Sequence, residues 1–127
     1  AVAPPGLAAG LGLDCEPLAP LDPALVPTIR REDEDGDPLR LFCAKEAAYK
    51  AQFALSARLL GFSALRVTLA PGAFSAELTE PAPPFAPGDR LAGRQAEVGG
   101  LLLSAVALPP GNAPFPARAL AAAGGDA

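Results

Sequence analysis

Histidine is absent from the 127-residue sequence, and no other gap in its composition excludes as much chemistry. A chain without histidine cannot build a serine–histidine–aspartate triad, a zincin site or most zinc and copper centres. A metal bound to this chain would have to be a hard cation with oxygen ligands.

Charged residues and long apolar runs are also scarce. Only 19% of the residues are charged and the net charge is −4, so the sequence has no basic field for nucleic acid. The apolar run LLLSAVAL at 101–108 is far shorter than the ~20 residues that span a bilayer. The apolar N-terminal segment lacks the basic region of a signal peptide. We therefore predict neither a nucleic-acid partner nor a membrane span.

The two cysteines, Cys15 and Cys43, follow no metal-binding or redox spacing. Isolated cysteines of this kind are most often buried thiols in a reducing compartment, and a disulfide between them is the alternative. The sequence therefore predicts a cytoplasmic protein in which both thiols are free and buried.

Half of the residues are apolar, which is enough for one domain with a core. The predicted strands cover 1–3, 11–16, 62–70, 73–78, 91–98 and 101–108, and the main helix covers 39–53. The helical pattern extends, with a break, toward Gly61. The proline-rich segment 20–28 permits only a short helix or turns, whereas 29–38 and 79–90 are predicted loops. This order predicts an α+β fold with an antiparallel sheet packed on one main helix, followed by a mobile Pro/Gly/Ala-rich tail at 110–127.

A glutamate interrupts the largest apolar stripe of the predicted helix. At about 100° per residue, one direction is shared by Leu39, Phe42, Tyr49 and Phe53, with Glu46 in the middle. One interpretation is an exposed ion pair between Glu46 and Lys50, four residues later. The other is that the stripe packs inward, so that Glu46 requires a proton, a positive partner or a metal.

A second cluster of acids lies in the segment GLGLDCEP. Asp14 and Glu16 are two residues apart in a predicted strand, so their carboxylates share one face of it. An ordinary strand end that turns to solvent at Pro17 would explain the pair. If Glu46 joins them, the three acids form an oxygen-rich site of the kind that holds Mg²⁺ together with substrate phosphates.

Two lysines border the same helix stripe. Lys50 lies one turn beyond Glu46, and Lys45 flanks it. A ligand diphosphate could be held between the metal and these ammonium groups.

The segments GLGLDCE and LFCAKEAAYKA together resemble the paired signature of the 4'-phosphopantetheinyl transferases. That signature is a Gly-hydrophobic-Asp-x-Glu segment followed by a Lys-Glu-Ala/Ser-x-x-Lys helix, here similar to the enterobactin-synthetase component D type of the surfactin-synthetase-activating class. The resemblance covers roughly residues 1–109. It implies a two-lobed fold of which this chain is the C-terminal half, with the N-terminal lobe missing.

The resemblance also implies an activity. Such an enzyme transfers the 4'-phosphopantetheine group of coenzyme A to a serine of an acyl or peptidyl carrier protein, with Mg²⁺ bridging the diphosphate. The metal-binding acids of the family are matched by Asp14, Glu16 and Glu46. Lys50 matches the phosphate-contacting lysine, and Lys45 matches the lysine beside the metal glutamate.

The family also implies a general base that takes the serine proton. Glu34 in TIRREDE is the best positional match, and Glu32 is its near competitor. The structural alternative is that this block of charge is simply a solvated acidic loop.

Two other classes of function remain open from the sequence. A homotrimeric holo-carrier-protein synthase would build its sites from identical short subunits, although its Asp motif lies at the very start of the chain. A non-catalytic fragment or binding module that pairs with a separate N-terminal half would bind a carrier protein without modifying it.

Overall fold

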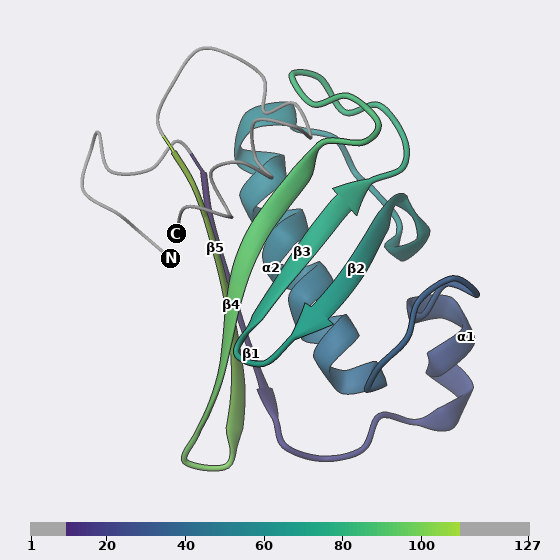
Figure 1. Cartoon of the computed structure of the whole chain (residues 1–127), viewed down its shortest axis with the longest axis vertical. Helices are drawn as coiled ribbons and strands as arrows, with labels where there is room; N and C mark the ends of the chain where they lie inside the picture. Colours follow the sequence, from purple (N-terminus) through teal and green to yellow (C-terminus); the bar gives the residue numbers. More distant parts are fainter. Residues whose placement is uncertain (1–9, 110–127) are drawn as a thin grey trace.

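One long helix packs against one face of a five-stranded antiparallel sheet in the computed structural model, which describes residues 10–109 (Figure 1). The strands are β1 (Gly10–Pro17), β2 (Leu65–Ala70), β3 (Ala73–Leu78), β4 (Arg90–Val98) and β5 (Leu101–Leu108), in the spatial order β1-β5-β4-β3-β2. The main helix is α2 (Pro38–Ser56), and α1 (Val26–Ile29) is a single turn. The predicted α+β fold with an antiparallel sheet on one main helix is confirmed.

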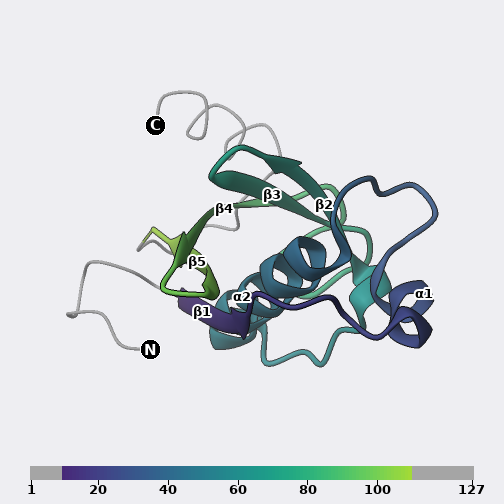
Figure 2. The same cartoon turned by 90° about the horizontal axis from the view of Figure 1, so that it is seen from below.

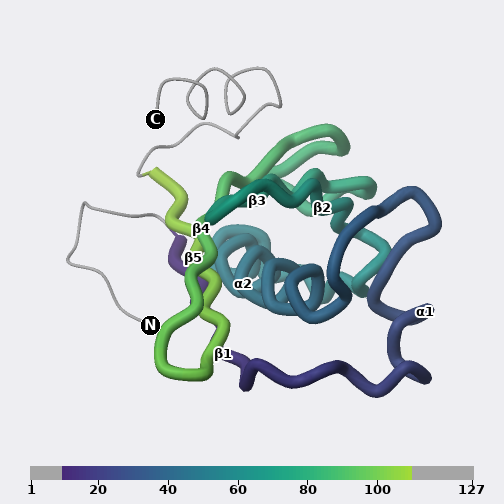
Figure 3. Tube along the Cα trace, turned by 60° about the horizontal axis from the view of Figure 1, so that its bottom comes forward, coloured from purple at the N-terminus to yellow at the C-terminus, as the bar shows by residue number. Residues whose placement is uncertain are grey.

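The sheet curves around the helix. Figures 2 and 3 show α2 between the two edge strands, β1 on one side and β2 on the other. The β4–β5 hairpin turns at Gly99 and Gly100, which both have positive φ, as the sequence predicts for a tight turn. No helix among residues 10–109 is both long and apolar enough to cross a membrane.

Several predicted boundaries need correction. The helix begins at Pro38, where the Asp37 side chain accepts a hydrogen bond from the Arg40 amide (3.0 Å). It ends at Ser56 because Ala57 adopts a left-handed conformation (φ 56°), well before the predicted stop at Gly61. The start of the predicted strand 62–70 is a 3₁₀ turn at Phe62–Ala64. The predicted strand at 1–3 and tail at 110–127 lie outside the described residues.

The face of α2 that meets the sheet is not the aromatic stripe. The fully buried residues of the helix that form the main core are Leu41, Ala44, Ala47, Ala48 and Ala51. Phe42 and Tyr49 are only half-buried, and Phe53 is 41% exposed. Leu39, at the start of the stripe, is buried, and Tyr49 packs against the core. The interpretation that the Leu39/Phe42/Phe53 side packs inward therefore holds for Leu39 and is wrong for Phe53.

The close approach of β1 to the helix explains why small residues are selected there. A Cβ atom added to Gly12 would lie 1.9 Å from the Ala47 carbonyl oxygen and 2.7 Å from the Ala51 nitrogen. Only glycine therefore fits at this position of the strand. The aromatic residues of the stripe take no part in this contact and remain partly exposed.

We expect Gly12→Ala to lower the free energy of unfolding by about 3 kcal/mol or more, because strand and helix backbones must separate. Denaturant titration followed by circular dichroism measures this loss. Gly61→Ala is the matched control: Gly61 has an ordinary φ of −77° and no atom within 4 Å of an added Cβ. The control should change stability by no more than about 0.5 kcal/mol. Equal effects of the two substitutions would contradict the close-approach argument.

Candidate active site on β1 and α2

The two acids of β1 lie on the face of the strand that is turned toward α2. Asp14 is buried and Glu16 is half-buried, whereas Leu13 and Cys15 are exposed on the opposite face. The usual arrangement of an edge strand is inverted here, with carboxylates inward and apolar groups outward. A strand end that merely turns to solvent does not have this pattern.

The same alternation corrects the prediction for one cysteine. Cys15 is exposed, because it shares the outer face with Leu13. Cys43 is buried as predicted, and both thiols are free. Burial raises the pKa of Cys43 to about 12, so this thiol is protonated and unreactive.

Lys50 reaches from α2 to the edge of β1. Its Nζ donates to the Leu13 carbonyl oxygen (2.9 Å) and to Asp14 Oδ1 (3.1 Å). This ion pair therefore joins the helix to the strand. The second carboxylate oxygen, Asp14 Oδ2, is buried and has no hydrogen-bond partner within residues 10–109. A buried oxygen without a donor is costly unless a proton or a cation satisfies it.

The three acids of the two motifs influence one another electrostatically. Burial raises the pKa of Glu16 to about 7, with further contributions from hydrogen bonding to Asp14 and from the charges of Asp14 and Glu46. Burial and the charge of Asp14 also raise the pKa of Glu46, which Lys50 partly offsets. A proton shared between Glu16 and Asp14 is one way to satisfy the orphaned oxygen. A divalent cation is the other.

Asp14, Glu16 and Glu46 do not surround a common point closely enough to bind a metal ion as they stand. Among residues 10–109, no three His, Cys, Asp or Glu side chains are arranged so as to hold a metal. The carboxylate oxygens, the raised pKa values of Glu16 and Glu46, and the unpaired Asp14 Oδ2 fit a hard cation chemically. A shared Mg²⁺ would require side-chain movement that brings the carboxylates together.

The raised pKa of Glu16 predicts a pH dependence of stability. A folded-state pKa of about 7, against 4.5 for the ordinary group, means that the folded protein retains a proton that the unfolded chain releases. The free energy of unfolding therefore falls as pH rises from about 4.5 to about 7. We expect Glu16→Gln to remove this loss and to be more stable than wild type at pH 8 by about 1 kcal/mol, since solvent screens part of the effect.

Thermal unfolding at pH 5 and pH 8 tests this expectation. Glu80→Gln, at an exposed site, is the control and should follow wild type at both pH values. Millimolar Mg²⁺ should stabilise wild type at pH 8 more than at pH 5, because the cation competes with the proton. Parallel pH curves for Glu16→Gln and wild type would exclude the coupling between the acids.

Two pockets border the acids. A pocket of about 180 Å³ lies beside Glu46, with Lys45, Tyr49, Leu60, Gly61, Phe62 and Leu65 as its other lining residues. A larger hollow of about 630 Å³ is lined by Asp14, Lys50 and Arg94 together with apolar residues of β1, β4 and β5. The acids thus lie between a small aromatic pocket and a broader apolar surface.

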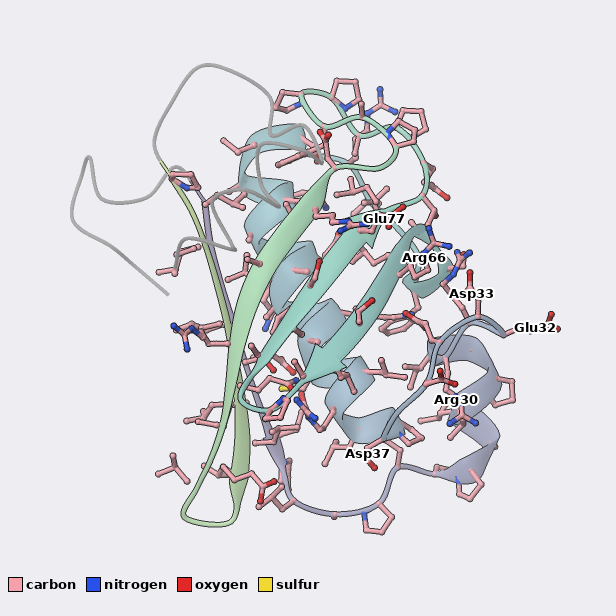
Figure 4. All side chains as sticks on the ribbon, viewed as in Figure 1. Arg30, Glu32, Asp33, Asp37, Arg66 and Glu77 are labelled. Carbon is pink, nitrogen blue, oxygen red and sulfur yellow. The ribbon has the colours of Figure 1, made fainter. Side chains whose placement is uncertain are left out.

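The other two predicted site residues lie in a buried ion pair. Lys45 Nζ is 2.7 Å from Glu34 Oε1, and the exposed fractions of the two side chains are 1% and 0%. Glu34 is therefore not part of a solvated loop, whereas Glu32 is exposed and points away from the body of the protein (Figure 4). Burial lowers the pKa of Lys45, and the hydrogen bond with Glu34 opposes that shift.

A network of surface ion pairs, which the sequence did not predict, holds the exposed side of the loop that contains Glu34. Asp33 accepts from Arg31 (2.8 Å) and from Arg66 (3.1 Å), and Arg66 also donates to Glu77 (2.8 Å) (Figure 4). These residues come from the loop, β2 and β3. No sequence spacing signals such a contact, because its members are brought together only by the fold.

Comparison with known proteins adds no relative: no protein-family model matches the chain, and no curated protein matches it. The resemblance to the 4'-phosphopantetheinyl transferases therefore rests on the two motifs of the sequence. The described geometry supports a functional proposal through the contact between those motifs.

Proposed function

We propose that this chain is the C-terminal lobe of a cytoplasmic, Mg²⁺-dependent 4'-phosphopantetheinyl transferase that uses coenzyme A and modifies an acyl or peptidyl carrier protein. The observation that carries the proposal is the contact between the two motifs. The helix-motif lysine, Lys50, pairs with the strand-motif acid, Asp14, whose charge also reaches Glu16 and Glu46. Residues 36 positions apart thus meet, and together with the neighbouring acids they would supply the carboxylate and ammonium groups that a metal–diphosphate complex requires.

In the proposed reaction, the carrier serine oxygen bonds to the phosphorus that bears pantetheine. The bond from that phosphorus to the bridging diphosphate oxygen breaks, adenosine 3',5'-bisphosphate leaves, and the serine proton passes to a base. Mg²⁺, when held by Asp14, Glu16 and Glu46, would supply charge neutralisation at the diphosphate. Lys50, with about half of its side chain exposed, is free to exchange Asp14 for a phosphate oxygen.

The apolar outer face of the sheet supports the proposal of a second lobe. Four large side chains on β1, β4 and β5 are exposed there, namely Leu13, Val98, Leu101 and Leu103. β1 is also an edge strand, and the hollow beside Lys50 opens on this side. A first lobe that covers this face would shield the apolar surface and the open edge at β1, and it would cover the hollow beside Lys50.

Mass spectrometry of a carrier protein incubated with coenzyme A and Mg²⁺ tests the proposed function. The chain is assayed alone and fused after the first lobe of a two-lobed transferase. Attachment of phosphopantetheine by the fusion supports the proposal, provided that it requires Mg²⁺ and Asp14. Carrier binding without transfer would indicate a non-catalytic binding module. Activity of the chain alone as a trimer would indicate the holo-carrier-protein synthase class.

A further inference from the structure

The ammonium group of Lys45 is fully engaged inside the protein. It donates to the Ile29 carbonyl oxygen (2.7 Å), to Glu34 Oε1 (2.7 Å) and to the Phe62 carbonyl oxygen (3.1 Å). An ammonium has three donors, and all three are used here. Lys45 therefore has no donor left for a phosphate group.

Glu34 is engaged to the same degree. Its Oε1 also accepts from the Arg31 amide (2.8 Å), and its Oε2 accepts from the Val67 amide (2.6 Å). A carboxylate with both oxygens bonded and no exposed surface cannot take a proton from an incoming serine without breaking these contacts. The pair instead joins the end of α1, the acidic loop, α2, the 62–64 turn and β2.

This junction forms one wall of the pocket beside Glu46. The Phe62 carbonyl is held by Lys45, and the Phe62 ring lies against Phe42 with ring centroids 5.8 Å apart. Phe62 lines the pocket of about 180 Å³ together with Glu46 and Tyr49. Lys45 is adjacent to Glu46 on the helix, so it fixes the 62–64 turn directly beside that acid.

We propose that Lys45 and Glu34 are a positioning pair that holds the Phe62 wall of the Glu46 pocket. In this chain, Glu34 would thus have a positioning role and not that of the general base. Lys45 likewise would position the wall and not contact a phosphate. The structural part of this inference is independent of the proposed function, whereas its consequence for activity rests on it.

The single and double variants Glu34→Gln, Lys45→Met and Glu34→Gln/Lys45→Met test the pair. Either single change leaves one uncompensated charge in the interior, so each should lower the melting temperature by about 10 °C or more. The double variant removes both charges and should be more stable than either single variant. A double variant no more stable than the single ones would overturn the pairing. Asp35→Asn, exposed in the same loop, is the control and should melt as wild type does.

The wall itself is monitored by Tyr49, because the chain has one tyrosine and no tryptophan. Lys45→Met and the double variant both lack the bond to the Phe62 carbonyl. Below their melting temperatures, quenching of Tyr49 emission by acrylamide should rise about twofold in both, although the double variant regains stability. An uncompensated buried charge alone would raise the quenching in Lys45→Met but not in the double variant, which has no such charge. Quenching equal to wild type in both variants would overturn the positioning role.

Activity separates positioning from proton transfer. In the fused two-lobe protein, the double variant should retain kcat within about tenfold of wild type, whereas loss of a general base costs about 10²- to 10⁴-fold. A loss of the larger size with unchanged Tyr49 quenching would assign Glu34 as the base and overturn the proposal. Absence of transfer in the wild-type fusion would refute the proposed function, and the melting and quenching results would still judge the pair.

Discussion

Lys50→Ala is expected to slow carrier-protein modification by roughly 30- to 1,000-fold, which corresponds to about 2–4 kcal/mol of lost transition-state stabilisation. The reason is that Lys50 supplies the ammonium beside Asp14 at the point where the diphosphate would lie. The lysine end of this ion pair is about half-exposed but Asp14 is buried, so the same change should cost about 1–3 kcal/mol of folding stability because Asp14 loses its partner. Transfer rates in the fused two-lobe protein and denaturant titration of the chain measure the two effects separately.

Two further variants sharpen the Lys50 experiment. Arg58→Ala removes an exposed cation just after α2 and should leave transfer within about twofold of wild type, as most surface substitutions do. Glu46→Ala should differ from Lys50→Ala by raising the Mg²⁺ concentration required for half-maximal rate, because it removes a proposed metal ligand. If Lys50→Ala transfers at the wild-type rate, the contact of Lys50 with Asp14 is an ordinary ion pair without a role in catalysis.

The second large effect is expected from the proposed first lobe. The chain alone should modify a carrier protein at least about 100-fold more slowly than the fusion, since the proposed first lobe would supply about half of the substrate-positioning surface. Leu103→Asp should block restoration by a lobe supplied as a separate protein, because it places a charge in the middle of the apolar outer face. The measurement is the rate of carrier modification as a function of the concentration of the added lobe.

Leu59→Asp is the matched control for the outer face. Leu59 is 83% exposed and lies outside the sheet, in the segment after α2. The same substitution there should leave restoration unchanged. Equal inhibition by the two aspartates, or full activity of the unassisted chain as a monomer, would argue against a lobe docked on β1, β4 and β5.

Local signals were sufficient to predict most of the elements. Residues 39–53 are good helix formers without Gly or Pro, which predicts the body of α2, and the Gly99–Gly100 pair predicts the β4–β5 hairpin. Both signals act within a few residues, so they can be recognised without knowledge of the fold. The end of α2 was misplaced because Ala57, which terminates it, carries no sequence signal for a left-handed conformation.

The sequence alone determined the order of strands and helix and the shared face of Asp14 and Glu16, because a strand alternates strictly. It did not determine which side of α2 would be buried. Hydrophobic periodicity depends on which side chains are large and apolar, whereas burial depends on how closely the elements approach, and at Gly12 the strand lies against the backbone of Ala47 and Ala51. Tertiary structure alone also placed Lys45 on Glu34 and Lys50 on Asp14. These pairings depend on the distances between segments after folding, which no spacing along the chain encodes.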